Sequence, residues 1–201
     1  MPGTTPPDDE VVWNRARDGD ADAFTEIYDR HYDRVYRHSL RLAPTVHDTE
    51  DVAALVFLEA WRRRAHVRVV DGSVLPWLLV TANYVSANAS RSARRHRVAM
   101  AKLPLQESVD DSTDDVLDRI DSSGRESRLR AAFAQLAPND RDVLTLCVVH
   151  ELPLQQAADV LRVPVGTVKS RLSRAKRRLA TLTGPDLAPS LSAIATMGEH
   201  Q

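Results

Sequence analysis

The side chains best suited to chemistry in this sequence are cationic and hydroxyl groups that gather between residues 165 and 178. Guanidinium, ammonium and hydroxyl groups bind phosphate oxygens and base edges, and by themselves they cleave no bond. No acidic residue lies between Asp159 and Asp186, so nothing in this stretch opposes a polyanion. The candidate contacts are Thr167, Lys169, Ser170, Arg171, Arg174 and Arg177. Their types and spacing predict binding to nucleic acid.

A short helix, a tight turn and a longer basic helix must position these side chains. Apolar residues in 154–161 recur at the i, i+3, i+4, i+7 spacing of one helix face. Pro164 and Gly166 interrupt that pattern, and a second helix follows with an apolar stripe opposite its cationic side. The sequence predicts a helix-turn-helix whose second helix enters the major groove. The alternative is a surface helix with solvated charges, but such helices usually mix charges of both signs.

A second basic stretch begins near Pro76, which suits the first turn of a helix. This helix is apolar at its start and basic from Arg91 to Arg97, which favours a track for a phosphate backbone. Its polar residues Asn83, Tyr84 and Asn88 could stack on bases or hydrogen-bond to them. Asp71-Gly72, just before the helix, is a turn signal.

No motif for catalysis is present: the sequence has no phosphate-binding glycine loop, nucleophile elbow or His/Cys metal cluster. We therefore expect no enzyme activity, no metal and no cofactor. The acidic residues in 48–51 are interpreted as the start of a helix rather than a metal site. His31 is interpreted as a half-buried packing histidine, with a metal ligand as the alternative. Cys147, the single cysteine, is interpreted as a buried thiol rather than a redox sensor.

Composition predicts an all-α fold of two small helical domains joined by a flexible acidic linker, the second domain containing the helix-turn-helix. Of 201 residues only seven are glycine, and 43% are hydrophobic. The expected organisation is a disordered N-terminus (1–9), a first domain (10–97), a linker (98–125), a second domain (126–183) and a tail (184–201). The tail is equally compatible with a short docking helix and with disorder. No signal peptide or membrane span is evident, so a soluble, cytoplasmic protein is expected.

Four stretches resemble, in this order and spacing, the extracytoplasmic-function (ECF) class of bacterial RNA polymerase sigma factors. They are AFTEIYDRHYDRVYRHSLRL, DTEDVAALVFLEAW, SVLPWLLVTANYVSANASRSARRHR and VPVGTVKSRLSRAKRRL. The resemblance covers about residues 20–97 and 126–182, as sigma regions 2 and 4. It implies a protein that binds core RNA polymerase and directs promoter-specific initiation, reading the −35 duplex and the melted −10 strand.

The resemblance also implies roles for individual residues. The six residues named above in 167–177 would read the −35 element. The −10 set would be Asp71, Ser73, Trp77, Asn83, Tyr84, Asn88, Arg91, Arg94 and Arg95, with the loop 68–74 as the pocket for a flipped base. Polymerase docking would involve Asp48, Asp51, Leu55, Leu58, Glu59 and Arg62. Three positions depart from the family pattern: Ala54-Leu55 replaces a Gln-acid pair, Asn83-Tyr84 replaces an Arg-Asn pair, and Arg162 replaces a turn glycine.

The implied partners are core RNA polymerase and promoter DNA, with an anti-sigma protein as a further candidate and no membrane or small-molecule substrate. One rival is a two-domain helix-turn-helix transcriptional regulator that acts on operator DNA without polymerase docking. Another is an adaptor or anti-sigma-like protein that never touches DNA. The Asp71 loop, followed by an apolar-to-basic helix, favours the sigma factor over both.

Overall fold

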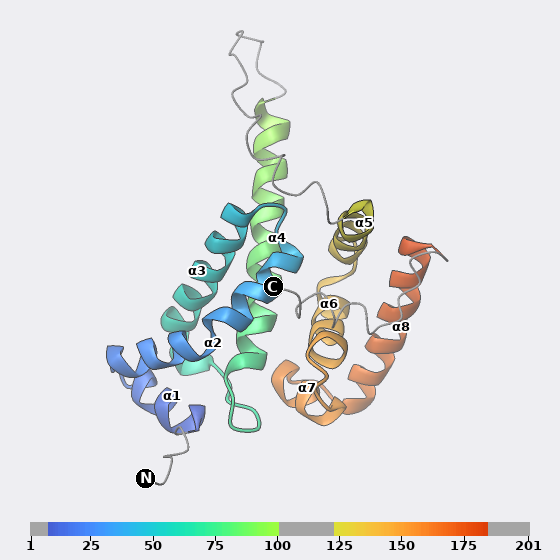
Figure 1. The fold of residues 1–201 in the computed structure, drawn as a ribbon. Helices are drawn as coiled ribbons and strands as arrows, with labels where there is room; N and C mark the ends of the chain where they lie inside the picture. Colours follow the sequence, from blue (N-terminus) through green and yellow to red (C-terminus); the bar gives the residue numbers. More distant parts are fainter. Residues whose placement is uncertain (1–7, 101–122, 185–201) are drawn as a thin grey trace.

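The computed structural model describes residues 8–100 and 123–184, and in these ranges every regular element is a helix (Figure 1). Four helices form a first module, followed by four helices of a second module. The first module contains α1 (Asp9–Arg17), α2 (Ala21–Leu42), α3 (Val46–Arg62), a 3-10 turn (Arg64–His66) and α4 (Leu75–Met100). The second contains α5 (Ser123–Ala134), α6 (Pro138–Leu144), a π-helical turn η3 (Thr145–Val149), α7 (Leu154–Leu161) and α8 (Val165–Thr183). This arrangement confirms the all-α prediction with a helix-turn-helix in the second module.

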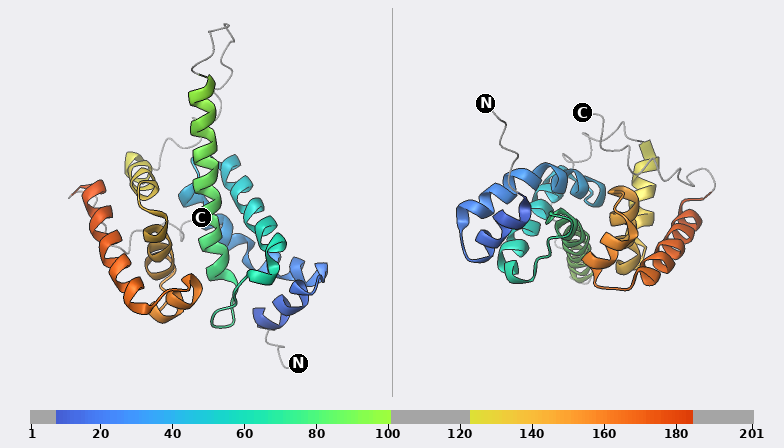
Figure 2. Two further views of the ribbon diagram at one scale, coloured as in Figure 1. Left: turned by 180° about the vertical axis from the view of Figure 1, so that it is seen from behind. Right: turned by 90° about the horizontal axis from the view of Figure 1, so that it is seen from below.

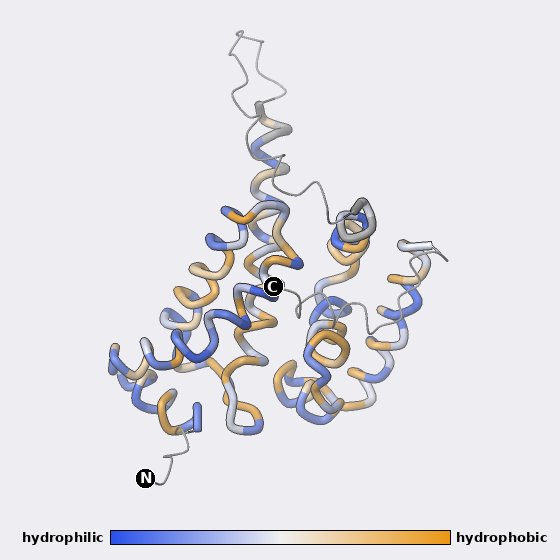
Figure 3. The backbone as a smooth tube through the Cα atoms, in the orientation of Figure 1, coloured by the Kyte–Doolittle hydropathy of each residue, from blue (hydrophilic) through white to orange (hydrophobic). Residues whose placement is uncertain are grey.

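Each module has its own apolar core. In the first, α2, α3 and α4 pack on one another and α1 packs on α2, with Trp13, Ile27 and Leu78 almost completely buried. In the second, α6 and α7 pack against α8 around Leu144 and Leu179. Hydrophobic and hydrophilic positions alternate along α8, as expected for a helix with one buried face (Figure 3). Two separate cores allow each module to present its own surface.

The two modules lie side by side and touch along α4, which contacts α6, η3 and α7 (Figure 2). The helices α2 and α5 also touch. None of the described helices is long and apolar enough to cross a membrane.

Helix starts follow local capping chemistry. At α2 the Asp20 carboxylate accepts hydrogen bonds from the backbone N–H groups of Asp22 and Ala23. At α3 the Thr45 hydroxyl accepts from the Asp48 N–H at 3.0 Å. At α6 the usual capping residue types, Asn139 and Asp140, lie inside the helix and do not cap it. The helix α6 begins at Pro138, because proline already has the φ of a first helical residue and needs no N–H partner there.

The N-terminal boundary also differs from the expectation. The predicted disordered stretch 1–9 includes Asp8, which caps α1, and Asp9, which begins it. The side chain of Asp9 is buried and holds neighbouring elements together, which a local sequence pattern does not reveal. Residues 1–7, most of the predicted linker (101–122) and the predicted tail from residue 185 lie outside the described ranges. The helix α4 extends three residues beyond Arg97, the predicted end of the first domain.

Candidate nucleic-acid interface

The helix-turn-helix is built by α7, the turn 162–164 and α8. The helix α7 spans Leu154–Leu161, the range that the apolar spacing predicts. Arg162 ends it in the left-handed conformation (φ 55°, ψ 46°), and its N–H donates to the Ala158 carbonyl. Pro164 then precedes α8, whose buried residue Val168 faces the second core. The left-handed residue lets the chain reverse within three residues, so the turn keeps the geometry that glycine usually provides.

Most of the −35 candidates point away from the protein. Lys169, Ser170 and Arg177 are exposed, while Thr167 and Arg171 are half-buried. The Ser170 hydroxyl donates to the backbone carbonyl of Thr167 at 3.0 Å, so its lone pairs remain available to accept a hydrogen bond. A cationic helix face free of carboxylates is the surface that a DNA groove requires.

Arg174 is the exception, because its guanidinium pairs with Asp140 of α6. The two nitrogens Nε and Nη2 donate to the two carboxylate oxygens at 3.1 and 2.6 Å. The side chain of Asp140 is 6% exposed, whereas that of Arg174 remains 57% exposed. This bidentate pair fixes the direction of the guanidinium on α8 and leaves one edge of it accessible.

In the first module, residues 70–73 form a tight hairpin ahead of α4. Val70 and Ser73 pair through two backbone hydrogen bonds of 2.9 and 3.1 Å. Asp71 and Gly72 both have positive φ, 51° and 72°, which defines a type I′ turn and confirms the turn signal. Asp71 is exposed at the tip.

Asp9 holds the base of this hairpin. Its carboxylate accepts from the Ser73 hydroxyl and the Val74 N–H, both at 3.1 Å. His31 Nε2 lies 2.6 Å from the same carboxylate. Burial raises the pKa of Asp9, but these hydrogen bonds and the charge of His31 outweigh burial and lower it to about 2.

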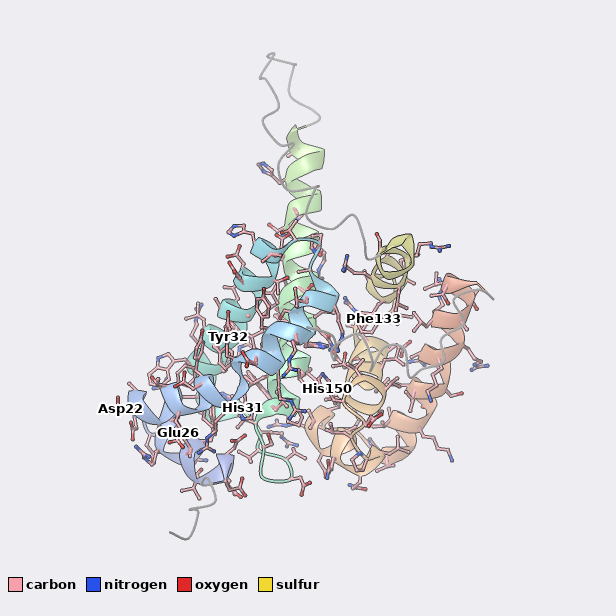
Figure 4. All side chains as sticks on the ribbon, viewed as in Figure 1. Asp22, Glu26, His31, Tyr32, Phe133 and His150 are labelled. Atoms are coloured by element: carbon pink, nitrogen blue, oxygen red, sulfur yellow. The ribbon has the colours of Figure 1, made fainter. Side chains whose placement is uncertain are left out.

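The position of His31 corrects its predicted role as a half-buried packing residue. It is only 8% exposed, and its Nε2 contacts the Asp9 carboxylate that holds the hairpin. Figure 4 labels it on α2, above the hairpin in that view. The described residues contain no group of three or more side chains arranged to hold a metal ion. The signal that could have identified Asp9 is the acidic run 8–10, which is typical of a helix N-terminus.

A cleft of about 420 Å³ lies between α4 and α6 of the second module, and Trp77, Tyr84 and Arg91 of α4 line one side of it. Tyr84 is 54% exposed, so its ring can stack against a planar group. Arg91 Nη2 donates to the Asn88 side-chain oxygen at 2.6 Å, which places two −10 candidates together. Arg95 is exposed, and the side chain of Arg94 lies outside the described part of the chain. The lining has charges of both signs, because Arg63 and Arg141 lie beside Glu59 and Asp142, and Asn83 also borders the cleft.

Asn83, in contrast, faces the second module. It is 3% exposed, and its amide nitrogen donates to Asp142 at 2.9 Å and to Thr145 at 3.0 Å. Its side-chain oxygen lies 3.1 Å from Nε2 of His38. Ser73 is also engaged internally, because its hydroxyl donates to Asp9 and accepts from the Leu75 N–H. Neither side chain is directed towards solvent in this arrangement.

The outer face of α3 carries the docking candidates. Leu55 and Leu58 are 44% and 48% exposed, which is unusual for large apolar side chains. Asp51 and Arg62 are exposed beside them. Asp48 takes part in the N-terminal cap, and Glu59 pairs with Arg63 at 2.8 Å. The face is therefore an apolar strip with charged margins.

Comparisons with known proteins fit this geometry. Residues 27–96 match the family model described as "Sigma-70 region 2", and residues 126–179 match that described as "Sigma-70, region 4". The chain is 27% identical over 175 residues to the ECF RNA polymerase sigma factor SigW of Bacillus subtilis, covering 82% of this chain and 91% of SigW. It is 28% identical to SigE, an ECF RNA polymerase sigma factor of Mycolicibacterium smegmatis, over 86% of this chain and 68% of SigE.

Two solved structures share the fold. One is CnrH in complex with the cytosolic domain of CnrY, with a TM-score of 0.53 and 20% identity, covering 87% of this chain and 96% of that chain. The other is the sigma factor RpoE in complex with the anti-sigma factor NepR from Bartonella quintana, with a TM-score of 0.51 and 18% identity. That match covers 81% of this chain and 98% of RpoE.

Proposed function

Because the chain belongs to the sigma-70 family of RNA polymerase sigma factors, as an ECF member, we propose that it gives core polymerase its promoter specificity. It binds core RNA polymerase and promoter DNA and directs initiation. It performs no bond-making chemistry of its own and acts where the polymerase acts, in the cytoplasm. The observation that carries this proposal is the presence of a different cationic surface on each of two modules, in the order of sigma regions 2 and 4.

The second module reads the upstream −35 duplex. The helix α8 enters the major groove, with Lys169, Ser170 and Arg177 exposed on the side opposite its buried stripe. Arg174 approaches the same groove with its guanidinium held by Asp140. A preset guanidinium loses less side-chain entropy on binding than a free one, so this pair favours a defined contact.

The first module captures the melted −10 strand. Moving a base out of the helical stack costs roughly a few kcal/mol, and a shaped pocket has to offset that cost. The hairpin 70–73 and the exposed face of α4 supply the two parts of such a site: a rigid turn with a carboxylate at its tip, and the Tyr84 ring on the same helix as Arg91. Arg91 and Arg95 hold the phosphates of the strand.

Core polymerase docks on the outer face of α3. Leu55 and Leu58 provide the apolar contact, and Asp51 and Arg62 flank it. The solved relative RpoE is seen with an anti-sigma factor. We propose that this chain also has an anti-sigma partner, which would compete for the same exposed apolar strip.

Run-off transcription with purified core polymerase and a promoter library tests the function. We expect initiation from a defined class of promoters only when this protein is added. The variant Leu55→Asp should abolish initiation and co-purification with core, while Val11→Asp, at an exposed apolar residue of α1, should leave both unchanged. Tight operator binding without core, together with no initiation, would instead identify a two-domain transcriptional regulator.

A further inference from the structure

The hairpin 70–73 is held from one side by α1, a helix that lies outside both family matches. The Asp9 carboxylate binds the Ser73 hydroxyl and the Val74 N–H, and it is itself fixed by His31. Asp8 lies against the turn, because a Cβ atom placed on Gly72 would lie 2.6 Å from the Asp8 carboxylate. The tip of the hairpin therefore has its position set by α1.

We propose that Asp9 is a positioning residue for −10 base selection. This proposal rests on the proposed function, because it assumes that the hairpin receives a base of the melted strand. Asp9 does not touch the DNA. It fixes the backbone from which Asp71 projects, and discrimination between bases requires donors and acceptors held within a fraction of an ångström.

Asp9→Asn in the full chain tests this role. We expect transcription from promoters with single-base changes in the −10 element to rise relative to the parent promoter, so that discrimination at one position falls at least about fivefold. Recognition of the −35 element and affinity for core should not change. The matched control is Asp20→Asn, which also neutralises a carboxylate at a helix N-terminus but one whose hydrogen bonds go to Arg15, Asp22 and Ala23 and not to the hairpin.

A structural role alone would lower transcription from all promoters by the same factor, and that result would overturn the proposal. If Asp9→Asn does not fold, Ser73→Ala removes one of the two hairpin contacts and should show the same loss of discrimination. Failure of the unmodified protein to initiate with core would reject the proposed function and would be seen before any variant is compared.

A second, independent observation concerns the contact between the modules. At its centre, the Asn83 amide, Thr145 and Asp142 form a buried polar cluster in which the Asn83 donors bind the second module. His38 and His150 meet edge to face beside it, with ring centroids 5.4 Å apart. Figure 4 labels His150, which comes from the second module. A buried polar cluster is satisfied in only one relative position of the modules, so it favours one discrete arrangement.

The same contact covers the hairpin from the side opposite α1. Gln156 of α7 donates to the Asp71 carboxylate at 2.8 Å, and the Arg68 guanidinium donates to the backbone carbonyl of Asp159. Val70 and Val80 of the first module pack against the core of the second. Asp71 and Asn83, two residues of the −10 set, therefore both have partners in the second module.

We infer that this arrangement is a closed state in which the second module engages Asn83 and one side of the hairpin, so that part of the −10 surface of the free protein is covered while Tyr84 stays exposed. The inference rests on the proposed function for the identity of the masked surface. While the state persists, the Asn83 amide has no donor left for a base, and Asp71 is engaged by Gln156. The affinity for a −10 strand is then reduced by the fraction of molecules that are open. A partner that separates the modules would remove that reduction.

The double variant Thr145→Val, Gln156→Ala weakens the contact without altering any proposed DNA-binding residue. Its shape is measured by small-angle X-ray scattering, and its affinity for a fluorescent single-stranded −10 oligonucleotide is measured without core. We expect a larger radius of gyration and affinity at least about fivefold higher than that of the unmodified chain. Gln135→Ala is the control, because this exposed glutamine of α5 donates to a carbonyl of its own helix.

Two results would overturn the masking. In one, the double variant expands but binds the oligonucleotide no better, so the contact does not limit access. In the other, the variant keeps the same radius and the same affinity, so these hydrogen bonds do not hold the modules together. A protein that initiates transcription with core but shows either result keeps the proposed function and loses only the closed state.

Discussion

Lowering the pH from 7 to 4 should destabilise this protein through two histidines at the contact between the modules. Burial lowers the pKa of His38 to about 4, against a raising effect of the Asn83 hydrogen bond, and Arg41 lowers it further. Burial also lowers the pKa of His150 to about 3, with additional lowering by His38, Arg41 and Arg34. Both residues are neutral in the folded protein at pH values where an unfolded chain binds a proton.

The sign follows from proton linkage. For each histidine the folded pKa lies below the ordinary value of 6.5, so its stability contribution is complete above pH 6.5 and is lost as the pH falls. Asp142 acts in the opposite direction, because burial raises its pKa to about 6 and folding is favoured when it is protonated. Each group changes the free energy of unfolding by about 1.4 kcal/mol per pH unit within its window. The two histidines lower the free energy of unfolding between pH 6 and 4, and Asp142 offsets half of that decrease. The free energy of unfolding therefore falls by about 3 kcal/mol over this range.

Urea unfolding followed by circular dichroism at several pH values between 7.5 and 4 would measure this loss. His38→Gln keeps an N–H for Asn83 but does not titrate, so its stability should fall less steeply than that of the unmodified protein. His66→Gln is the control, since His66 is exposed and should leave the slope unchanged. Constant or rising stability from pH 6.5 to 4.5, or a full slope in His38→Gln, would refute the reasoning.

Three further predictions concern single residues. Arg162→Gly should raise the unfolding free energy by about 0.5–1 kcal/mol, because glycine adopts the left-handed conformation at this position without steric cost. Arg162→Ala should not raise it, and equal urea midpoints for the two variants would contradict this prediction. Thr45→Ala should cost about 1 kcal/mol through loss of the α3 cap, measured by thermal unfolding, and no change would mean that water replaces the hydroxyl. Lys169→Ala should weaken use of −35 elements by about 1–3 kcal/mol in transcription assays, whereas unchanged promoter use would remove α8 from the duplex contact.

Much of the fold could be predicted from local patterns. The apolar spacing of 154–161, the interrupting Pro164 and the stripe of the next helix gave the helix-turn-helix, and α7 occupies the predicted range. Asp71-Gly72 likewise predicted the turn that the hairpin confirms. These features depend on residues within one or two turns of chain, so the sequence contains all the information that they need.

The candidate site was less predictable, because its side chains have partners far away in the chain. The sequence predicts Asn83 as a polar residue on a DNA-facing helix. In the structure it binds Asp142 and Thr145, which lie 59 and 62 residues further along the chain. Asp9 fell within a stretch expected to be disordered, although it anchors Ser73, 64 residues away. Local propensity assigns an element and a face, but not which of two faces another module covers.

The sequence by itself determined most of the helices, the turn chemistry and the separation of cationic from acidic segments, since short-range sterics, hydrogen bonding and charge specify these. Only the tertiary structure decided which polar groups are buried and paired across the two modules. That choice depends on the desolvation of groups brought together from distant positions, such as Asn83 and Thr145. Residue types alone do not specify those neighbours.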